Sequence, residues 1–419
     1  MTRNPAQHHA DLRGAARLAT EATAGLTDLV EAMHERIARV PGLATASPSE
    51  RTAGITGLVY KTVRGVTRLV GGSVDALLGL LTPALMAPQR DPADPDADAT
   101  WPNTDPPAPQ REALVAALNG VLGDHLAASA NPLATSMALR HQGRALVLQA
   151  AALKARLPQA GGRVLVAVHG LCMNDLQWRR EGHDHAQALA RDAGFTSIYL
   201  HYNSGQHIST NGQALAQQLE QLAEAWPGGL DSLTLLCHSM GGLLARSALH
   251  HATLAGHSWP ARLQQLVFLG TPHHGAPLER AGNWVDILLG AAPYAAPLAR
   301  LARVRSAGIT DLRHACLVDA DWAGRDRFAR GGAGPLHLPL PTSLACYAVA
   351  ASMGEAGGDL KDTVLGDGLV PLRSALGQHK RADRCLMFAP QHTQVVFKTH
   401  HMALLSSAEV YQALRRWLA

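Results

Sequence analysis

Short apolar runs alternate with longer segments of helical spacing from about residue 160 to the end of the sequence. Runs of strand length are RVLVAVHG (163–170), TSIYLHY (196–202), LTLLCHS (233–239), QQLVFLGTPHHG (264–275), SLACYAVAAS (343–352) and RCLMFAP (384–390). Helical spacing marks residues 183–193, 211–225, 241–254 and 407–418. Continuous apolar strands that alternate with helices are typical of a parallel sheet covered by helices on both faces. The pattern predicts the α/β fold class with a mostly parallel sheet.

The first 110 residues follow a different pattern. Residues 11–40 and 54–86 place apolar side chains three or four positions apart, which predicts two amphipathic helices. Residues 87–111 are crowded with proline and aspartate and predict a linker. We therefore expect an N-terminal helical extension with its linker over residues 1–110 and an α/β domain over residues 111–419.

The composition argues against some classes of function and indicates a cellular compartment. The net charge is +4 with basic residues spread along 419 residues, so no basic stripe for nucleic acid is present. Five cysteines form no CxxC pair, which disfavours a disulfide framework or a thiolate zinc site and favours a reducing compartment. The N-terminus has no apolar run after its basic residues, and Asp75 and Pro83 interrupt the one candidate span, 69–88. A cytoplasmic protein is expected.

A serine stands where the third apolar run meets a helical segment, in Cys237-His238-Ser239-Met240-Gly241-Gly242. A sharp turn from strand to helix with small neighbours exposes a serine Oγ as a nucleophile elbow. Gly241 fits the pattern, whereas Cys237 stands where glycine is usual. A strand that runs into a helix with a serine N-cap is the alternative interpretation.

The other parts of a serine hydrolase site are also present, and the acid and then the base follow the serine in the chain order expected for this fold. The backbone N–H groups of Met240 and Leu171 are candidate oxyanion donors, the latter after His169-Gly170 at the end of a strand, although an ordinary turn there is the alternative. Asp367 lies between two glycines and is preferred as the acid over two nearby aspartates, Asp359 and Asp362.

Two adjacent histidines precede the last helical segment and are the candidate bases. His401 is preferred because a buried face begins directly behind it, whereas His400 fits an exposed position. Ser239, Asp367 and His401 are therefore the expected catalytic triad.

The sequence gives no sign of a cofactor or a metal. No GK dipeptide and no glycine-rich dinucleotide fingerprint is present, which excludes a P-loop and a Rossmann site of the usual kind. The cluster His183-Asp184-His185 lacks the further ligands that a metal site needs. No cofactor and no metal are expected.

Several motifs in one order resemble the α/β-hydrolase superfamily, and specifically its lipase-like branch that is described as GPI-inositol-deacylase-like in bacteria. The motifs are VHGLCMND, YNSGQHISTNG, CHSMGG, LGTPHHGAP, GDGLVP and HHMALL, and they span residues 160–419. The resemblance implies Ser239 as nucleophile, His401 as general base and then acid, Asp367 as its orienting partner, and Leu171 and Met240 as oxyanion donors.

Two segments carry the remaining expectations. The insertion at about 276–341 corresponds to a cap over the active site in lipases, and its apolar part, 282–304, either lines an acyl pocket or packs as an extra helix. Lys61, Arg64 and Arg68 accompany the N-terminal apolar stripe, which either contacts an anionic membrane surface or packs against protein.

The function expected from these features is a serine carboxylic-ester hydrolase that forms an acyl-enzyme on a lipid-like or other apolar ester. An acyltransferase that uses the same acyl-enzyme and a non-catalytic lipid-binding or scaffolding protein are the alternatives. The sequence leaves the oligomeric state open.

Overall fold

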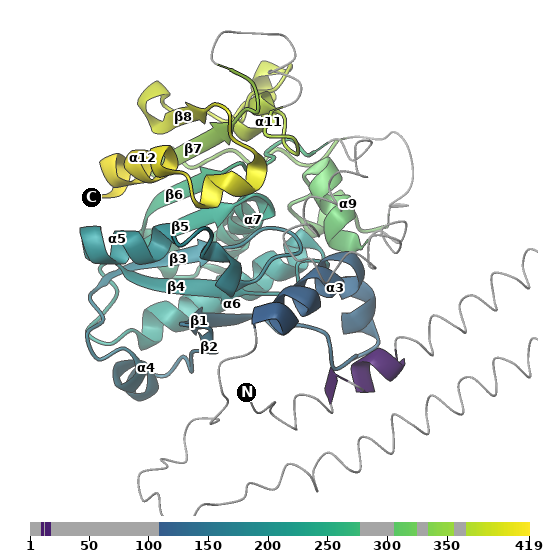
Figure 1. Ribbon diagram of the computed structural model, residues 1–419, viewed down its shortest axis with the longest axis vertical. Helices are drawn as coiled ribbons and strands as arrows, with labels where there is room; N and C mark the ends of the chain where they lie inside the picture. Colours follow the sequence, from purple (N-terminus) through teal and green to yellow (C-terminus); the bar gives the residue numbers. More distant parts are fainter. Residues whose placement is uncertain (1–9, 12, 18–108, 277–305, 325–333, 356–365) are drawn as a thin grey trace, which may run out of the picture. The chain divides into compact units, whose positions relative to one another are not determined.

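The computed structural model describes residues 10–11, 13–17, 109–276, 306–324, 334–355 and 366–419. The strands in these ranges are β1 Ala138–His141, β2 Arg144–Ala145, β3 Arg163–Val168, β4 Thr196–His201, β5 Ser232–His238, β6 Leu263–Leu269, β7 Ala345–Ala351 and β8 Thr393–Val396. They form one eight-stranded sheet with the order β2-β1-β4-β3-β5-β6-β7-β8 (Figure 1). The six strands from β3 to β8 run parallel to one another, and β1 pairs antiparallel with both β2 and β4. The α/β-hydrolase fold class expected from the sequence is confirmed.

Helices connect and cover these strands. In the described ranges after residue 108 the α-helices are α3 Pro109–Ala128, α4 Ala150–Arg156, α5 His185–Ala193, α6 Ile208–Ala225, α7 Met240–Ala255, α9 Ala307–His314, α11 Leu372–Ala375 and α12 Ala408–Leu418. Single 3₁₀ turns are η1 Asp175–Trp178, η2 Trp259–Arg262, η5 Asp319–Asp321, η6 Ala382–Arg384, η7 Pro390–His392 and η8 His401–Leu405. Helices α6 and α7 pack together over β5 and its neighbours, while α5 packs on α12 and on β4 (Figure 1).

The central strands form the core because their sequences are apolar on both faces. All seven residues of β5 are buried, as are five of the six in β3. Each leucine or valine side chain buried there contributes roughly 1.5–3 kcal/mol relative to an exposed one. The register aligns Val168 with Cys237 and Cys237 with Phe268, so β3, β5 and β6 end at neighbouring positions.

Local signals set the ends of the helices. Ser407 caps α12 by accepting the N–H of Val410, and Arg415 and Arg416 lie in the last turn, where cations favour the helix dipole. Asp184 caps α5 in the same way, and Gly194 ends that helix in the left-handed region with φ of 70°.

Two strand predictions were wrong in part. The run predicted over 264–275 ends at Leu269 because Gly270 turns with φ of 59°. The run 384–390 is not a strand: its backbone turns back toward the preceding loop, where the N–H of Leu386 donates to the carbonyl of Gly377 at 2.8 Å. The last strand is instead β8, only four residues long and only partly buried.

Several sequence-based expectations lie largely or wholly outside the described residues. Ala10, Asp11 and residues 13–17 are helical, but the rest of the predicted helix 11–40, the helix 54–86 with its three cations and the candidate span 69–88 are not described. The same holds for 282–304 and for Asp359 and Asp362. Among the helices that are described, none combines the length and the hydropathy that a membrane crossing requires. The five cysteines are free thiols.

A small unit near the N-terminus is described by itself. It contains residues 10–11, 13–17 and 128–133. Within it the Nδ2 of Asn131 donates to the carbonyl of Gly14 at 3.1 Å, and Arg17 donates to the carbonyl of Ala130 at 3.2 Å.

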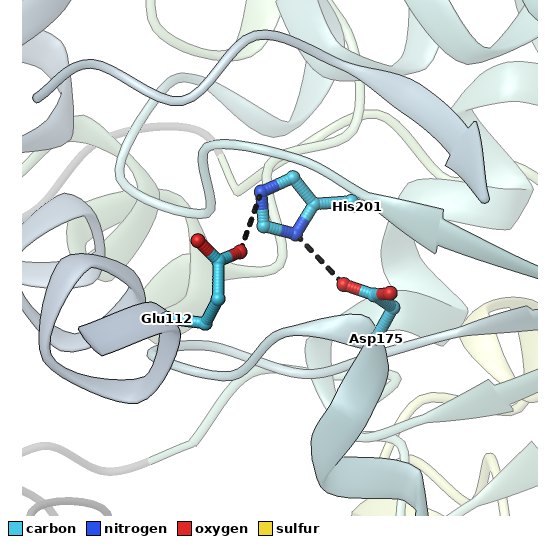
Figure 2. A group of neighbouring side chains, drawn as sticks. All are labelled: Glu112, Asp175 and His201. Carbon is cyan, nitrogen blue, oxygen red and sulfur yellow. Dashed lines mark ion pairs between the residues drawn. The ribbon is translucent and has the colours of Figure 1, made fainter. Parts of the chain in front are cut away.

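A buried ion cluster connects α3 to the sheet and to η1. Glu112, Asp175 and His201 lie close together (Figure 2), with His201 Nδ1 3.1 Å from Asp175 Oδ1 and His201 Nε2 3.9 Å from Glu112 Oε2. Arg140 on β1 joins both acids, because its Nη1 donates to Glu112 and to Asp175 at 3.0 Å each. Burial raises the pKa of Asp175, but His201 and Arg140 outweigh this effect and hold that pKa below its usual value.

We predict that Arg140→Met lowers the free energy of unfolding by about 3 kcal/mol or more, because it leaves buried Asp175 without its guanidinium and Glu112 with only that of Arg111. Denaturant unfolding of the pure protein measures this effect. Arg144→Met is the matched control, since Arg144 is exposed in the neighbouring strand and its loss should cost less than about 0.5 kcal/mol. Equal stability of the two variants would contradict the role given to Arg140.

Candidate active site

Ser239 occupies a strained turn between β5 and α7. Its φ is 54° and its ψ is −124°, a conformation that costs a residue other than glycine about 1–3 kcal/mol. Two backbone hydrogen bonds hold it: its N–H donates to the carbonyl of Leu269 at 2.8 Å, and its carbonyl accepts the N–H of Gly242 at 3.1 Å. Its side chain makes no cap hydrogen bond, so the alternative of a serine N-cap is not what the structure shows.

The start of α7 approaches the backbone of β3 so closely that only glycine fits at position 241. A Cβ on Gly241 would lie 2.4 Å from the carbonyl oxygen of Val168 and 2.7 Å from that of His169. A Cβ on Gly242 would lie 2.1 Å from Thr271 Oγ1. These two glycines therefore let the turn at Ser239 sit directly against the ends of β3 and β6.

Cys237, the departure from the usual elbow pattern, is accommodated inside β5. It is fully buried and pairs in the ladder with Val168 and Phe268. Burial raises the pKa of its thiol well above the usual value, which keeps the sulfur protonated and unreactive. The turn at Ser239 forms with cysteine at this position.

Asp367 and His401 are in direct contact. The Nδ1 of His401 lies 2.7 Å from Asp367 Oδ2, and the N–H of His401 donates to the carbonyl of Asp367 at 3.0 Å. The other carboxylate oxygen of Asp367 accepts the N–H groups of Leu369 and Val370 at 3.0 and 2.8 Å. Both side chains are about 1% exposed, so this pair is held rigidly and away from water.

Glycines on both sides make the turn at Asp367 feasible. Gly366 and Gly368 have φ values of 54° and 92°, and a Cβ on Gly366 would lie 1.9 Å from the carbonyl oxygen of Val370. His400, the other candidate base, is exposed. Of the two adjacent histidines, His401 is therefore the one that contacts Asp367.

The end of β6 contacts both the serine and the histidine. Leu269 accepts the N–H of Ser239, and the next residue, Gly270, lies against the imidazole of His401, since a Cβ there would be 3.1 Å from its Nδ1 and Cε1. His238 supports this arrangement from the other side: its ring lies 4.7 Å from that of His401, and its Nε2 is 3.3 Å from the carbonyl oxygen of His401.

The loop after β3 lies beside the serine. A Cβ on Gly170 would be 3.0 Å from Ser239 Cβ, so Leu171, the next residue, is at the edge of the same site. The loop is fixed by the N–H of Cys172, which donates to Ser204 Oγ at 3.0 Å. Met240 is the first residue of α7, where backbone N–H groups have no partner within a helix.

Two buried histidines near the site were missed from the sequence. His169 stacks on Tyr202, whose hydroxyl donates to the carbonyl of His169 at 2.9 Å. Burial lowers the pKa of His169 to about 3 and that of His238 well below its usual value, which keeps both rings neutral. Each stands at the end of a fully apolar run, beside Gly170 or Ser239, and this position is the signal that could have identified them.

Within the described residues one group has the geometry of a metal site, and it is the ion cluster of Figure 2. The ligand atoms of Glu112, Asp175 and His201 lie within 4.8 Å of one another. Arg140 already bridges the two carboxylates and supplies the positive charge that a cation would bring. We therefore interpret the group as structural.

The comparisons with known proteins agree with this fold. Residues 159–336 match the family described as PGAP1-like alpha/beta domain. This range contains Ser239, Leu171 and Met240 but ends before Asp367 and His401. A comparison with curated proteins found no match.

Three solved structures illustrate the likeness. A lipase of Bacillus licheniformis, BlEst2 in its mature form, shares 17% identity with a TM-score of 0.39 and covers 61% of this chain and 92% of its own. An esterase of Pyrococcus furiosus shares 10% identity with a TM-score of 0.36 and covers 62% of this chain and 83% of its own. A thioesterase from the prodiginine pathway of Streptomyces coelicolor shares 14% identity with a TM-score of 0.35 and covers 62% of this chain and 90% of its own.

The resemblance inferred from the motifs is thus confirmed at the level of the family. Between residues 159 and 336, the strands β3 to β6 and the turn at Ser239 all fall inside the matched range. The chain has the α/β-hydrolase fold, and its residues 159–336 match the family described as PGAP1-like alpha/beta domain.

Proposed function

We propose that this protein is a serine hydrolase of carboxylic esters, with Ser239 as nucleophile, His401 as general base and acid, and Asp367 as the residue that orients His401. The observation that carries the proposal is the Asp367–His401 pair, buried and joined at 2.7 Å, held by the same end of β6 that fixes the strained turn of Ser239. A serine with no cap role that costs conformational energy calls for a chemical reason.

The proposed reaction has two steps. The Oγ of Ser239 attacks the ester carbonyl while the Nε2 of His401 takes the hydroxyl proton, and that proton passes to the departing alcohol to leave an acyl-enzyme. Water then attacks the acyl group, gives its proton to the same nitrogen, and the acid leaves as Ser239 recovers its proton. Asp367 keeps the proton on Nδ1 of His401, which leaves Nε2 as the base.

The oxyanion of each tetrahedral intermediate needs donors beside the serine. The N–H of Met240 follows the nucleophile directly, and the N–H of Leu171 follows the glycine that contacts Ser239 Cβ. We propose these two N–H groups as the oxyanion hole.

For the substrate we propose a lipid-like or other apolar ester, a choice supported by the apolar sequence of residues 282–304. A panel of esters of increasing acyl length, assayed with and without an added alcohol acceptor, tests this choice. Free acid as the main product supports hydrolysis, whereas a new ester of the added alcohol would identify an acyltransferase. Turnover confined to the shortest acyl chains would reject the lipid-like substrate.

We predict that Ser239→Ala lowers ester turnover by roughly four to six orders of magnitude, because it removes the nucleophile. Steady-state kinetics on a short water-soluble ester measures the effect, and circular dichroism checks that the variant folds. Near-normal turnover in the pure, folded variant would reject Ser239 as nucleophile.

We predict that His401→Ala is nearly as damaging as the serine variant, while His400→Ala keeps turnover within a few-fold of wild type. His401 contacts Asp367, whereas His400 is exposed, so the adjacent histidine is a matched control. The same kinetic assay separates them. If His400→Ala is the inactive variant and His401→Ala is active, the base is His400.

We predict that Asp367→Asn lowers turnover by about four orders of magnitude, because an amide favours the wrong tautomer of His401. Asp362→Asn tests the less favoured candidate acid, and Asp231→Asn, at an exposed position, is the control. Both variants should lower turnover only slightly. Measurement of kcat for the three variants decides the matter, and strong loss in Asp362→Asn with little loss in Asp367→Asn would move the acid to Asp362.

A further inference from the structure

A polar cavity of about 140 Å³ lies beside α7, on the side of residues 334–338 and 379–384. Its lining includes two arginines and five histidines: Arg246, Arg384, His273, His274, His314, His337 and His379. The lining contains no carboxylate side chain within the described residues. It uses none of the residues assigned above to ester hydrolysis.

Arg246 is the most deeply buried charge in this lining. Only 7% of the residue is exposed, and its Nη2 donates to the carbonyl of Leu338 at 2.6 Å. Its Nε and Nη1 are buried and have no hydrogen-bond partner in the described part of the chain. Burial lowers the pKa of Arg246 to about 10, so the guanidinium is still charged at neutral pH.

His273 presents a second set of buried polar atoms to the same cavity. It is 3% exposed, its backbone N–H donates to the carbonyl of Ser374 at 3.3 Å, and its ring meets Phe268 edge-on at 4.6 Å. Neither ring nitrogen has a partner among the described residues. A neutral imidazole still offers one N–H donor, and burying such a donor without an acceptor costs free energy.

A metal ion does not fit this lining. Two guanidinium groups repel a cation, and the group of described residues with metal-ligand spacing lies elsewhere, at Glu112, Asp175 and His201. The acid nearest in sequence to Arg384 is Asp383, which is exposed and pairs with Arg381 at 2.6 Å. The unsatisfied Nε and Nη1 groups of Arg246 are donors, as is one ring nitrogen of His273, and an acceptor that carries negative charge would satisfy these donors and offset the buried charge of Arg246.

We propose that this cavity binds a phosphate-type oxyanion, with Arg246 and Arg384 supplying charge and His273 an N–H donor. A guanidinium matches the oxygen pairs of such an anion, and charge-assisted hydrogen bonds of this kind are among the strongest in proteins. A volume of about 140 Å³ is several times the roughly 30 Å³ that one water occupies, which leaves room for a tetrahedral anion.

The anion has two chemical sources, a free phosphate or a phosphate carried by the ester substrate. Arg246 follows Ser239 by seven residues of α7, which is about 10 Å along a helix axis. His273 follows Gly270, the residue against His401, by three residues. A substrate phosphate a few bonds from its ester is therefore within reach, and this second source rests on the proposed function.

Binding of inorganic phosphate to the full chain tests the site without reference to catalysis. Isothermal titration at constant ionic strength, with chloride as the competing anion, should give saturable binding to wild type. Arg246→Met and Arg384→Gln should each weaken it by about tenfold or more, the value of one charge-assisted hydrogen bond. Arg415→Gln, at an exposed position on α12, should leave it unchanged. If Arg246→Met does not fold, the partly exposed Arg384 decides the test.

No phosphate binding to wild type above the chloride control, or equal binding in Arg384→Gln and wild type, overturns the proposal. If wild type binds phosphate, steady-state kinetics then distinguish a free phosphate from a phosphate carried by the substrate. If the substrate carries the anion, phosphate competes with a phosphate-bearing ester and Arg384→Gln raises its KM at least tenfold, with no change for a neutral ester. If phosphate is bound free, neither KM changes. Inactivity of the enzyme on every ester would reject the proposed function and leave the phosphate result standing.

Discussion

The left-handed backbone of Ser239 is the constraint on which the site depends. That turn exists because Gly241 lets the start of α7 touch the carbonyl groups at the end of β3, and because Leu269 accepts the N–H of the serine. A side chain at position 241 would push the helix away from the sheet. The serine, the loop with Leu171 and the first N–H of α7 would then no longer share one edge of the sheet.

The short segment after β6 connects the separate parts of this edge. Gly270 lies against His401, Thr271 against Gly242, and His273 lines the polar cavity. Each of these contacts needs the backbone to leave the strand at Leu269, which the positive φ of Gly270 provides. One tight turn thus positions the histidine of the proposed triad and carries a donor of the proposed anion site.

The strands that could be predicted from the sequence are those buried on both faces. Residues 164–168 are a continuous apolar run, residues 233–237 are apolar except for Thr234, and all of them are buried in the sheet. Two short outer strands give no such signal: β1, next to the edge strand β2, has the sequence ALRH, and the edge strand β8 has the sequence TQVV. Both are half polar, and pairing with a neighbour decides their conformation. The run 384–390 has the apolar sequence of a strand but forms a loop, in which Leu386 is buried while Met387 is 86% exposed.

The site divides in a similar way between local and distant information. The glycines beside Asp367 and the apolar run after His401 are local signals, and the two side chains they favoured are the ones in contact. Other contacts join segments that are far apart in sequence. Glu112 pairs with Arg140, and the polar cavity is lined by Arg246, His273 and Arg384. Spacing within one segment cannot reveal such contacts, because they depend on how the layers pack.

The proposed chemistry depends on the activation of Ser239 by His401. Labelling the folded full-length protein with a fluorophosphonate, followed by peptide mass spectrometry, tests it most directly. We predict a single adduct, on Ser239, that forms at least a hundredfold more slowly in His401→Ala and at the wild-type rate in His400→Ala. An adduct on a different serine, or labelling of Ser239 at the same rate without His401, would contradict the account.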